Sequence, residues 1–208
     1  MKTLNIDTWD RKEQFLFFKD FEEPFWGVSI DADCTKSYNY CKKEGISFFL
    51  FYLHCSLVAA NQTEPFRYRI TDNQVVIYDT VNASPTINRD NGTFGFAYID
   101  YNPNFFEFKK KAETEINRVR SNNDFVPAGS GVNVIHYSSL PWIKFTSLSH
   151  ARRFVSADSC PKITFGKLTK TGKKVNMPVS IHVHHALMDG YHVGKFIEIF
   201  SHALDITP

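Results

Sequence analysis

Five residues that could carry acid–base or metal chemistry lie within eleven positions near the end of the sequence. They are four histidines and one aspartate: His182, His184, His185, Asp189 and His192. An imidazole titrates near neutral pH, so a histidine at a strand end can take a proton from a hydroxyl or a thiol. The pattern H-x-x-x-D-G from His185 to Gly190 predicts such a strand end, followed by a sharp turn.

Two other interpretations of this cluster remain open on spacing alone. The histidines could line a strand without any chemical role. Alternatively, His182 and His184 share one face of a strand, and Asp189 could supply a third metal ligand. The metal interpretation explains neither His185 nor the turn at Gly190. We therefore favour general-base catalysis by His185, with no metal ion.

The elements that would position these residues follow from the spacing of apolar side chains. Helical spacing predicts helices over residues 9–21, 33–43, 47–61, 104–122 and 194–204. Alternation predicts strands over residues 66–70 and 74–78, which form a hairpin, and over 25–32, 93–101, 132–137, 144–148, 163–169 and 175–184. Helices and strands do not alternate regularly, so an α+β fold with a mixed, mostly antiparallel sheet is expected.

Composition places the chain among ordinary globular proteins. A length of 208 residues suits one domain, residues 1–208, and the hydrophobic and charged fractions are 43% and 22%. The net charge of +2 predicts neither nucleic-acid binding nor a basic membrane anchor. The longest apolar stretch, residues 46–58, is interrupted by polar side chains and is too short to cross a bilayer.

The cysteines and the N-terminal segment both indicate a cytoplasmic protein. The four cysteines form no C-x-x-C pair, and we expect them to be reduced thiols: Cys34, Cys41, Cys55 and Cys160. The first fifteen residues lack the apolar stretch of a signal peptide.

Six segments carry a more specific pattern when they are taken in order. They are W-D-R-K-E-Q-F at 9–15, Y-D-T-V at 78–81, T-F at 93–94, S-S-L-P-W-I-K-F at 138–145, P-K-I-T-F-G-K at 161–167 and H-H-A-L-M-D-G at 184–190. In this order and spacing, the sequence resembles the chloramphenicol acetyltransferase family. The resemblance implies a two-layer sandwich of sheet and helices that transfers an acetyl group from acetyl-CoA to a hydroxyl of chloramphenicol.

The resemblance also implies roles for individual residues of the chemical step. His185 would be the general base, and Ser138 would donate a hydrogen bond to the oxyanion that forms. Thr164 would help to bind the tetrahedral intermediate through water. Asp189 would form a structural ion pair with Arg11, which supports the loop that orients the histidine.

The same resemblance implies the binding partners. Lys167 would lie on the CoA side, with acetyl-CoA as a co-substrate and no permanently bound cofactor. The family forms homotrimers with each active site between two subunits. The acceptor would contact several further positions: Phe18, Phe25, Thr93, Phe94, Phe125, His136, Leu148 and His150.

The sequence departs from the family pattern around the acceptor. His150, Arg152 and Lys162 stand where the family has apolar side chains, and His136 replaces an asparagine. An unpaired cation is costly to bury in an apolar pocket. Either these side chains turn outward, or the pocket suits a more polar or anionic acceptor. Two further departures are Leu168, for a tyrosine after the lysine on the CoA side, and Met188, for a cysteine before Asp189.

Other functions remain as alternatives. The same fold could serve an acyltransferase with a more polar acceptor, or a homologue that binds ligands without turnover. The acyltransferase cores of 2-oxo acid dehydrogenases also carry an H-x-x-x-D-G motif. That class is expected to have a lipoyl domain and an Ala/Pro-rich linker, and the sequence shows neither.

Overall fold

The computed structural model describes residues 1–125, 131–152 and 158–206. The helices of the described chain are α1 (Lys12–Phe18), α2 (Thr35–Glu44), α3 (Phe48–Gln62), α4 (Phe105–Ser121) and α5 (Gly190–Asp205). Its strands are β1 (Lys2–Thr3), β2 (Phe25–Asp33), β3 (Tyr68–Thr71), β4 (Gln74–Ile77), β5 (Asn82–Asn88), β6 (Phe94–Phe96), β7 (Val134–Ser139), β8 (Lys162–Phe165), β9 (Thr169–Thr171) and β10 (Lys174–His184).

The main sheet is mixed, as the sequence predicts. Its strand order is β2-β10-β8-β7-β5-β6, and β9 pairs with the start of β10. Strand β7 is parallel to β5 and to β8, and the other pairs of this sheet are antiparallel. A separate small sheet joins β1, β4 and β3. The predicted α+β class with a mostly antiparallel sheet is therefore confirmed.

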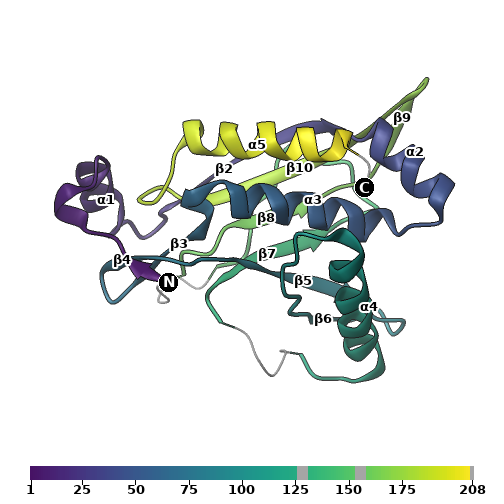
Figure 1. Cartoon of the computed structure of the whole chain (residues 1–208), viewed down its shortest axis with the longest axis horizontal. Helices are drawn as coiled ribbons and strands as arrows, with labels where there is room; N and C mark the ends of the chain where they lie inside the picture. Colours follow the sequence, from purple (N-terminus) through teal and green to yellow (C-terminus); the bar gives the residue numbers. More distant parts are fainter. Residues whose placement is uncertain (126–130, 153–157, 207–208) are drawn as a thin grey trace.

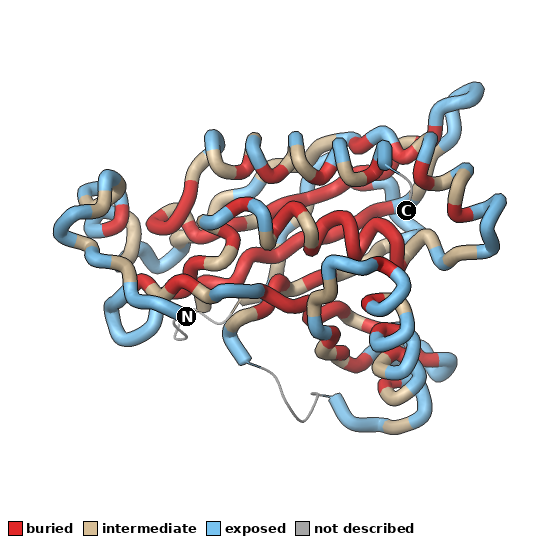
Figure 2. The backbone as a smooth tube through the Cα atoms, viewed as in Figure 1, coloured by how far each residue is buried: buried red, intermediate tan, exposed pale blue. Residues whose placement is uncertain are grey.

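The two faces of the main sheet differ in chemistry. On β10, every second side chain is apolar and belongs to the hydrophobic core: Val175, Met177, Val179, Ile181 and Val183. Helices α3 and α5 pack together along this face (Figure 1), and the buried part of the backbone tube runs through the sheet and their inner sides (Figure 2). The intervening residues of β10 are mostly polar and include Ser180, His182 and His184. They point to the opposite face, which no helix of the described residues covers (Figure 1).

Local signals explain where the helices near this sheet begin and end. The Ser47 hydroxyl accepts the Leu50 N–H at 3.5 Å and begins α3. Gly45 has a φ of 66° and ends α2 in the left-handed conformation. Helix α5 begins at Gly190, four residues earlier than predicted, because Asp189 caps it and His192 completes a capping box.

One predicted strand is wrong, and one strand of the main sheet was not predicted. Residues 144–148 do not form a strand, because no strand of the described residues pairs with them. Within this segment, the side chain of Phe145 is buried. Strand β5 was not predicted, because its small polar residues and Pro85 do not alternate. It is nevertheless an interior strand, and its Pro85 carbonyl accepts the Ala97 N–H at 2.9 Å.

The described part of the chain has two further properties. No helix within it is long and apolar enough to cross a membrane. All four cysteines are buried and free. Burial raises the pKa of the thiols, to about 12 for Cys34 and about 11 for Cys41, so they are poor nucleophiles at neutral pH.

Candidate active site

His185 immediately follows the last residue of β10 and is held on several sides. Its backbone N–H donates to the carbonyl of Pro24 at 2.8 Å. Its ring stacks on Phe18 of α1, with centroids 4.1 Å apart and planes 18° apart, and the ring of Trp26 lies 5.6 Å away. The ring atom Nδ1 is buried and has no hydrogen-bond partner in the described chain. The aromatic contacts therefore fix the position of the imidazole and leave Nδ1 without a hydrogen bond.

The turn after His185 is tied to α1 by one ion pair. The guanidinium of Arg11 contacts the carboxylate of Asp189 and also donates to the His185 carbonyl at 3.3 Å. Asp189 accepts the Tyr191 N–H at 3.1 Å and lies 2.8 Å from Nδ1 of His192. Burial alone would raise the pKa of Asp189, but Arg11 and His192 outweigh it and lower the pKa. Asp189 is therefore an ionised carboxylate that holds the turn.

Ser138 and Thr164 lie side by side on the polar face of the sheet. The register places Ser138 of β7 opposite Thr164 of β8, and Thr164 opposite Ser180 of β10. Thr164 and Ser180 are fully buried, whereas Ser138 is half-buried. This row of hydroxyls is the one place where the structure brings together two residues predicted to contact the tetrahedral intermediate.

The structure does not bring Ser138 and His185 together within one chain. His185 is five positions beyond Ser180 along β10, which corresponds to roughly 16 Å of strand. Because β10 runs antiparallel to β8, His185 lies at the end of the sheet where β7 begins, and Ser138 lies near the end of β7. The predicted base and the predicted oxyanion donor are thus at opposite ends of the sheet.

A cluster of imidazoles occupies the polar face between these two ends. His136, Lys162 and His182 form the row next to the hydroxyl row. His150 covers both rows, with Nε2 3.5 Å from Oγ1 of Thr164 and its ring 4.9 Å from that of His182. Burial, assisted by the charge of Lys162, lowers the pKa of His136 to about 4. Burial and the neighbouring His182 lower that of His150 to about 4.

The two cations of this region have acidic partners. Lys162 is only 7% exposed, and its ammonium group lies 2.5 Å from the carboxylate of Asp158. Arg152 forms an ion pair with Glu23. Both cations also lie over the ring of Phe25, the guanidinium at 4.8 Å and the ammonium at 4.6 Å from its centroid. Neither is therefore an unpaired charge in an apolar pocket.

The remaining predicted residues are spread over the surface. Thr93, Phe94 and Phe125 line a shallow hollow with Arg89, and no described contact connects them to the imidazole cluster. The carbonyl of Leu148 accepts a hydrogen bond from His182. Lys167 is exposed, and its backbone N–H donates to the Ile143 carbonyl at 2.8 Å.

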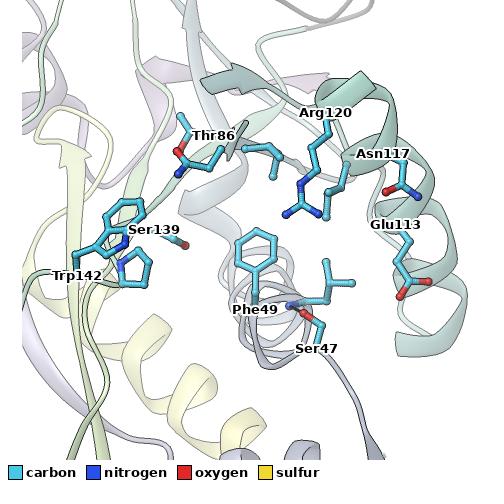
Figure 3. A pocket seen from close by; sticks show the side chains of 13 residues that line it. Ser47, Phe49, Thr86, Glu113, Asn117, Arg120, Ser139 and Trp142 are labelled. Atoms are coloured by element: carbon cyan, nitrogen blue, oxygen red, sulfur yellow. Dashed lines mark hydrogen bonds between the residues drawn. The ribbon is translucent and has the colours of Figure 1, made fainter. Parts of the chain in front are cut away.

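A cavity of about 580 Å³ beside the end of β7 was not predicted from the sequence. Figure 3 shows that four separate segments line it: the start of α3 with Phe49, the end of β5 with Thr86, one face of α4, and the loop after β7 with Trp142. The guanidinium of Arg120 extends from α4 into the cavity (Figure 3) and forms no ion pair with a described acidic residue. Trp142 is 64% exposed, and its place in the P-W-I-K-F motif was the only available signal.

Neither set of possible metal ligands is well suited to a metal ion. In the set suggested by sequence, Asp189 is engaged by Arg11 and His192, away from His182. A second set appears only in the structure, where ligand atoms of His136, Asp158 and Cys160 all lie within 4.8 Å of one another. However, the Lys162 ammonium binds both Asp158 and the Cys160 carbonyl, so a divalent cation would have to displace it.

The fold defines the general class of the protein. A probable dihydrolipoamide acetyltransferase from Listeria monocytogenes superimposes with a TM-score of 0.67 over 99% of this chain and 94% of that chain, at 12% identity. A likeness at this identity shows a shared fold and nothing about substrate. The mixed sheet of this chain and its helices thus have the same overall fold as that protein.

Closer similarity shows the family. The family model for chloramphenicol acetyltransferase matches residues 1–201. Chloramphenicol acetyltransferases from Proteus mirabilis and Staphylococcus aureus are 28% and 26% identical, over 93% and 97% of this chain and 90% and 97% of theirs. A solved chloramphenicol acetyltransferase, 30% identical, superimposes with a TM-score of 0.90 over 98% of this chain and 99% of that chain. The chain belongs to the chloramphenicol acetyltransferase family and is a CoA-dependent acetyltransferase.

Proposed function

We propose that the chain, as a single domain, transfers an acetyl group from acetyl-CoA to a hydroxyl of a small acceptor, for which chloramphenicol is the first candidate. The observation that carries the proposal is the fixed imidazole of His185. It is stacked on Phe18, and its backbone is held by Pro24 and Arg11. A general base must be oriented before the reaction, and these contacts supply that orientation.

The chemistry of the transfer assigns one role to each residue. His185 takes the proton of the acceptor hydroxyl as its oxygen attacks the thioester carbonyl carbon. The resulting oxyanion accepts a hydrogen bond from Ser138, assisted through water by Thr164. The intermediate then collapses, the C–S bond breaks, and the departing CoA sulfur takes the proton from the imidazolium. The products are the acetyl ester and free CoA.

The separation of His185 from Ser138 supports catalysis between subunits. The two residues lie at opposite ends of the sheet of one chain. His185 of one subunit would therefore act beside Ser138 of a neighbour, as in the homotrimer that the family resemblance implies. The helix-free polar face of the sheet is where the neighbour would cover the hydroxyl row.

The cavity beside the end of β7 is the proposed site for acetyl-CoA. It reaches Ser139, which follows the proposed oxyanion donor in β7 and turns its side chain to the helix-covered face, toward Tyr52 of α3. The thioester would therefore have to pass the end of β7 to reach the hydroxyl of Ser138. Phe49 and Trp142 offer flat surfaces for the adenine ring, and Arg120 offers an unpaired cation for a phosphate group. Lys167 would add a second positive charge from the neighbouring loop.

A thiol-release assay with purified protein, acetyl-CoA and chloramphenicol tests this function. We expect acceptor-dependent release of CoA that His185→Ala abolishes. His202→Ala, which alters an exposed histidine of α5, is the matched control and should leave the rate unchanged. Release with other hydroxyl compounds but not with chloramphenicol would correct the acceptor. No thioester cleavage with any acceptor would overturn the enzymatic proposal in favour of a ligand-binding homologue.

A further inference from the structure

The imidazole cluster on the polar face points to the chemical class of the acceptor, and this inference rests on the proposed function. We propose that the acceptor is an uncharged molecule that presents several hydrogen-bonding groups to the wall formed by His136 and His150. We further propose that His150 is a specificity-determining residue, which disfavours acceptors that place an apolar group at this wall.

The imidazole cluster lies next to the residues proposed to bind the reacting groups. His136 is two residues from Ser138 on β7, so both side chains point to the same face, roughly 7 Å apart along the strand. His150 lies within 3.5 Å of Thr164, the neighbour of Ser138 across the sheet. An acceptor hydroxyl that attacks a thioester beside Ser138 therefore brings the rest of a small molecule over these imidazoles.

The charges around the imidazole cluster favour an uncharged acceptor. His136 and His150 are neutral at pH 7 because burial lowers their pKa to about 4, and burial also lowers the pKa of His182. Lys162 is paired with Asp158, and Arg152 with Glu23. These groups leave neither a free cation for an anionic acceptor nor a free carboxylate for a cationic one.

The free ring nitrogens of the cluster favour an acceptor with a polar surface. Each neutral imidazole has one donor and one acceptor nitrogen. His182 already uses both, since Nδ1 lies 3.3 Å from Oγ of Ser180 and the ring also bonds the Leu148 carbonyl, and Nε2 of His150 lies 3.5 Å from Oγ1 of Thr164. The free capacity therefore belongs to His136 and to Nδ1 of His150. A ligand that covers such a nitrogen with an apolar group leaves it without a partner, at about a tenfold or greater loss of affinity per group. A ligand with hydroxyl or amide groups at the same places restores those hydrogen bonds. The wall therefore selects a polar surface on the acceptor.

Substitutions at His150 test the wall with chloramphenicol as the probe, because this molecule carries aryl and dichloromethyl groups. Calorimetry would measure its Kd for the wild type, for His150→Leu and for His150→Gln. We expect His150→Leu to bind chloramphenicol at least tenfold more tightly and His150→Gln, which keeps a neutral amide, to remain within about threefold of the wild type. Equal or weaker binding by His150→Leu, with thermal unfolding unchanged, would overturn the role of His150.

A charged form of the same probe tests the preference for an uncharged acceptor. Chloramphenicol hemisuccinate differs from the drug by an ester that carries a carboxylate. We expect the wild type to bind it more weakly than chloramphenicol, and tighter binding would overturn the requirement for an uncharged acceptor. Because calorimetry reads binding alone, a protein that binds these probes and releases no thiol would refute the proposed reaction and leave this inference standing.

Discussion

Single residues of the polar face are informative because their chemistry departs from the apolar pocket that the family resemblance implies. Lys162 and Arg152 are each neutralised by an acidic partner and lie over Phe25. Several imidazoles remain neutral because they are largely buried near these cations. The residues therefore form an internally compensated polar group.

The imidazoles predict how stability depends on pH. Burial lowers the pKa of His136, His150 and His184 to about 4, whereas an unfolded histidine titrates near 6.5. The unfolded state therefore binds more protons as pH falls below about 6.5, and stability is lost between that value and about 4. We expect the Tm to fall from pH 7 to pH 4.5. His150→Gln should reduce the slope, and an unchanged slope would contradict the assignment of His150.

Three elements meet at one ion pair, and this gives Arg11 and Asp189 a role beyond their own contacts. Arg11 precedes α1, which carries Phe18, and Asp189 begins α5. The guanidinium also reaches the carbonyl of His185 after β10. The ion pair therefore fixes the angle between the strand end and the ring that stacks on His185.

This arrangement predicts that Arg11 is a positioning residue. Arg11→Lys keeps the charge, but a lysine cannot contact the carboxylate and the carbonyl together in the same geometry. We expect kcat to fall about tenfold or more, with the KM for acetyl-CoA nearly unchanged, since the residue binds neither substrate. A rise in KM without loss of kcat would contradict the positioning role.

Variants of Asp189 separate its two functions. Asp189→Asn keeps a good cap for α5 and removes the charge, whereas Asp189→Ala removes both. We expect similar losses of kcat, and a further loss of about 1 kcal/mol in unfolding free energy for Asp189→Ala alone. Denaturant unfolding of the two variants measures this difference.

At the scale of the whole molecule, the sheet separates the proposed base from the proposed oxyanion donor. His185 and Ser138 lie roughly 16 Å apart along the strand direction. Loop motions cannot close this distance, because both residues are anchored to strands of the same sheet. If both residues act as proposed, a complete site would therefore require a second copy of the chain.

Mixed oligomers test this requirement directly. Chains with His185→Ala and chains with Ser138→Ala would be coexpressed with different tags and purified through both tags. A mixed trimer with sites between subunits contains one intact site in three, so about one third of wild-type activity should return. Mixtures of His185→Ala and His185→Gln chains are the control and should stay inactive. Activity no higher than that of the single variants would place both residues in one chain.

The sequence by itself determined the family, the general base candidate and most of the elements. The H-x-x-x-D-G pattern locates His185 because a strand end and a capped helix are local features, which depend on residues close in the sequence. The apolar alternation of β10 and the helical spacing of α4 are local for the same reason. The local pattern gave no correct prediction for β5 and for residues 144–148. There, the pairing of strands depends on the neighbouring strands and not on local preference.

Only the tertiary structure decided the character of the site. Arg152 forms an ion pair with Glu23, more than a hundred residues away in the sequence, and His150 contacts Thr164 of the sheet. The cavity with Trp142 and Arg120 needs four segments that are distant in the chain. Such pairings depend on long-range packing, and that packing also turned three apparently misplaced polar residues into a compensated, uncharged wall.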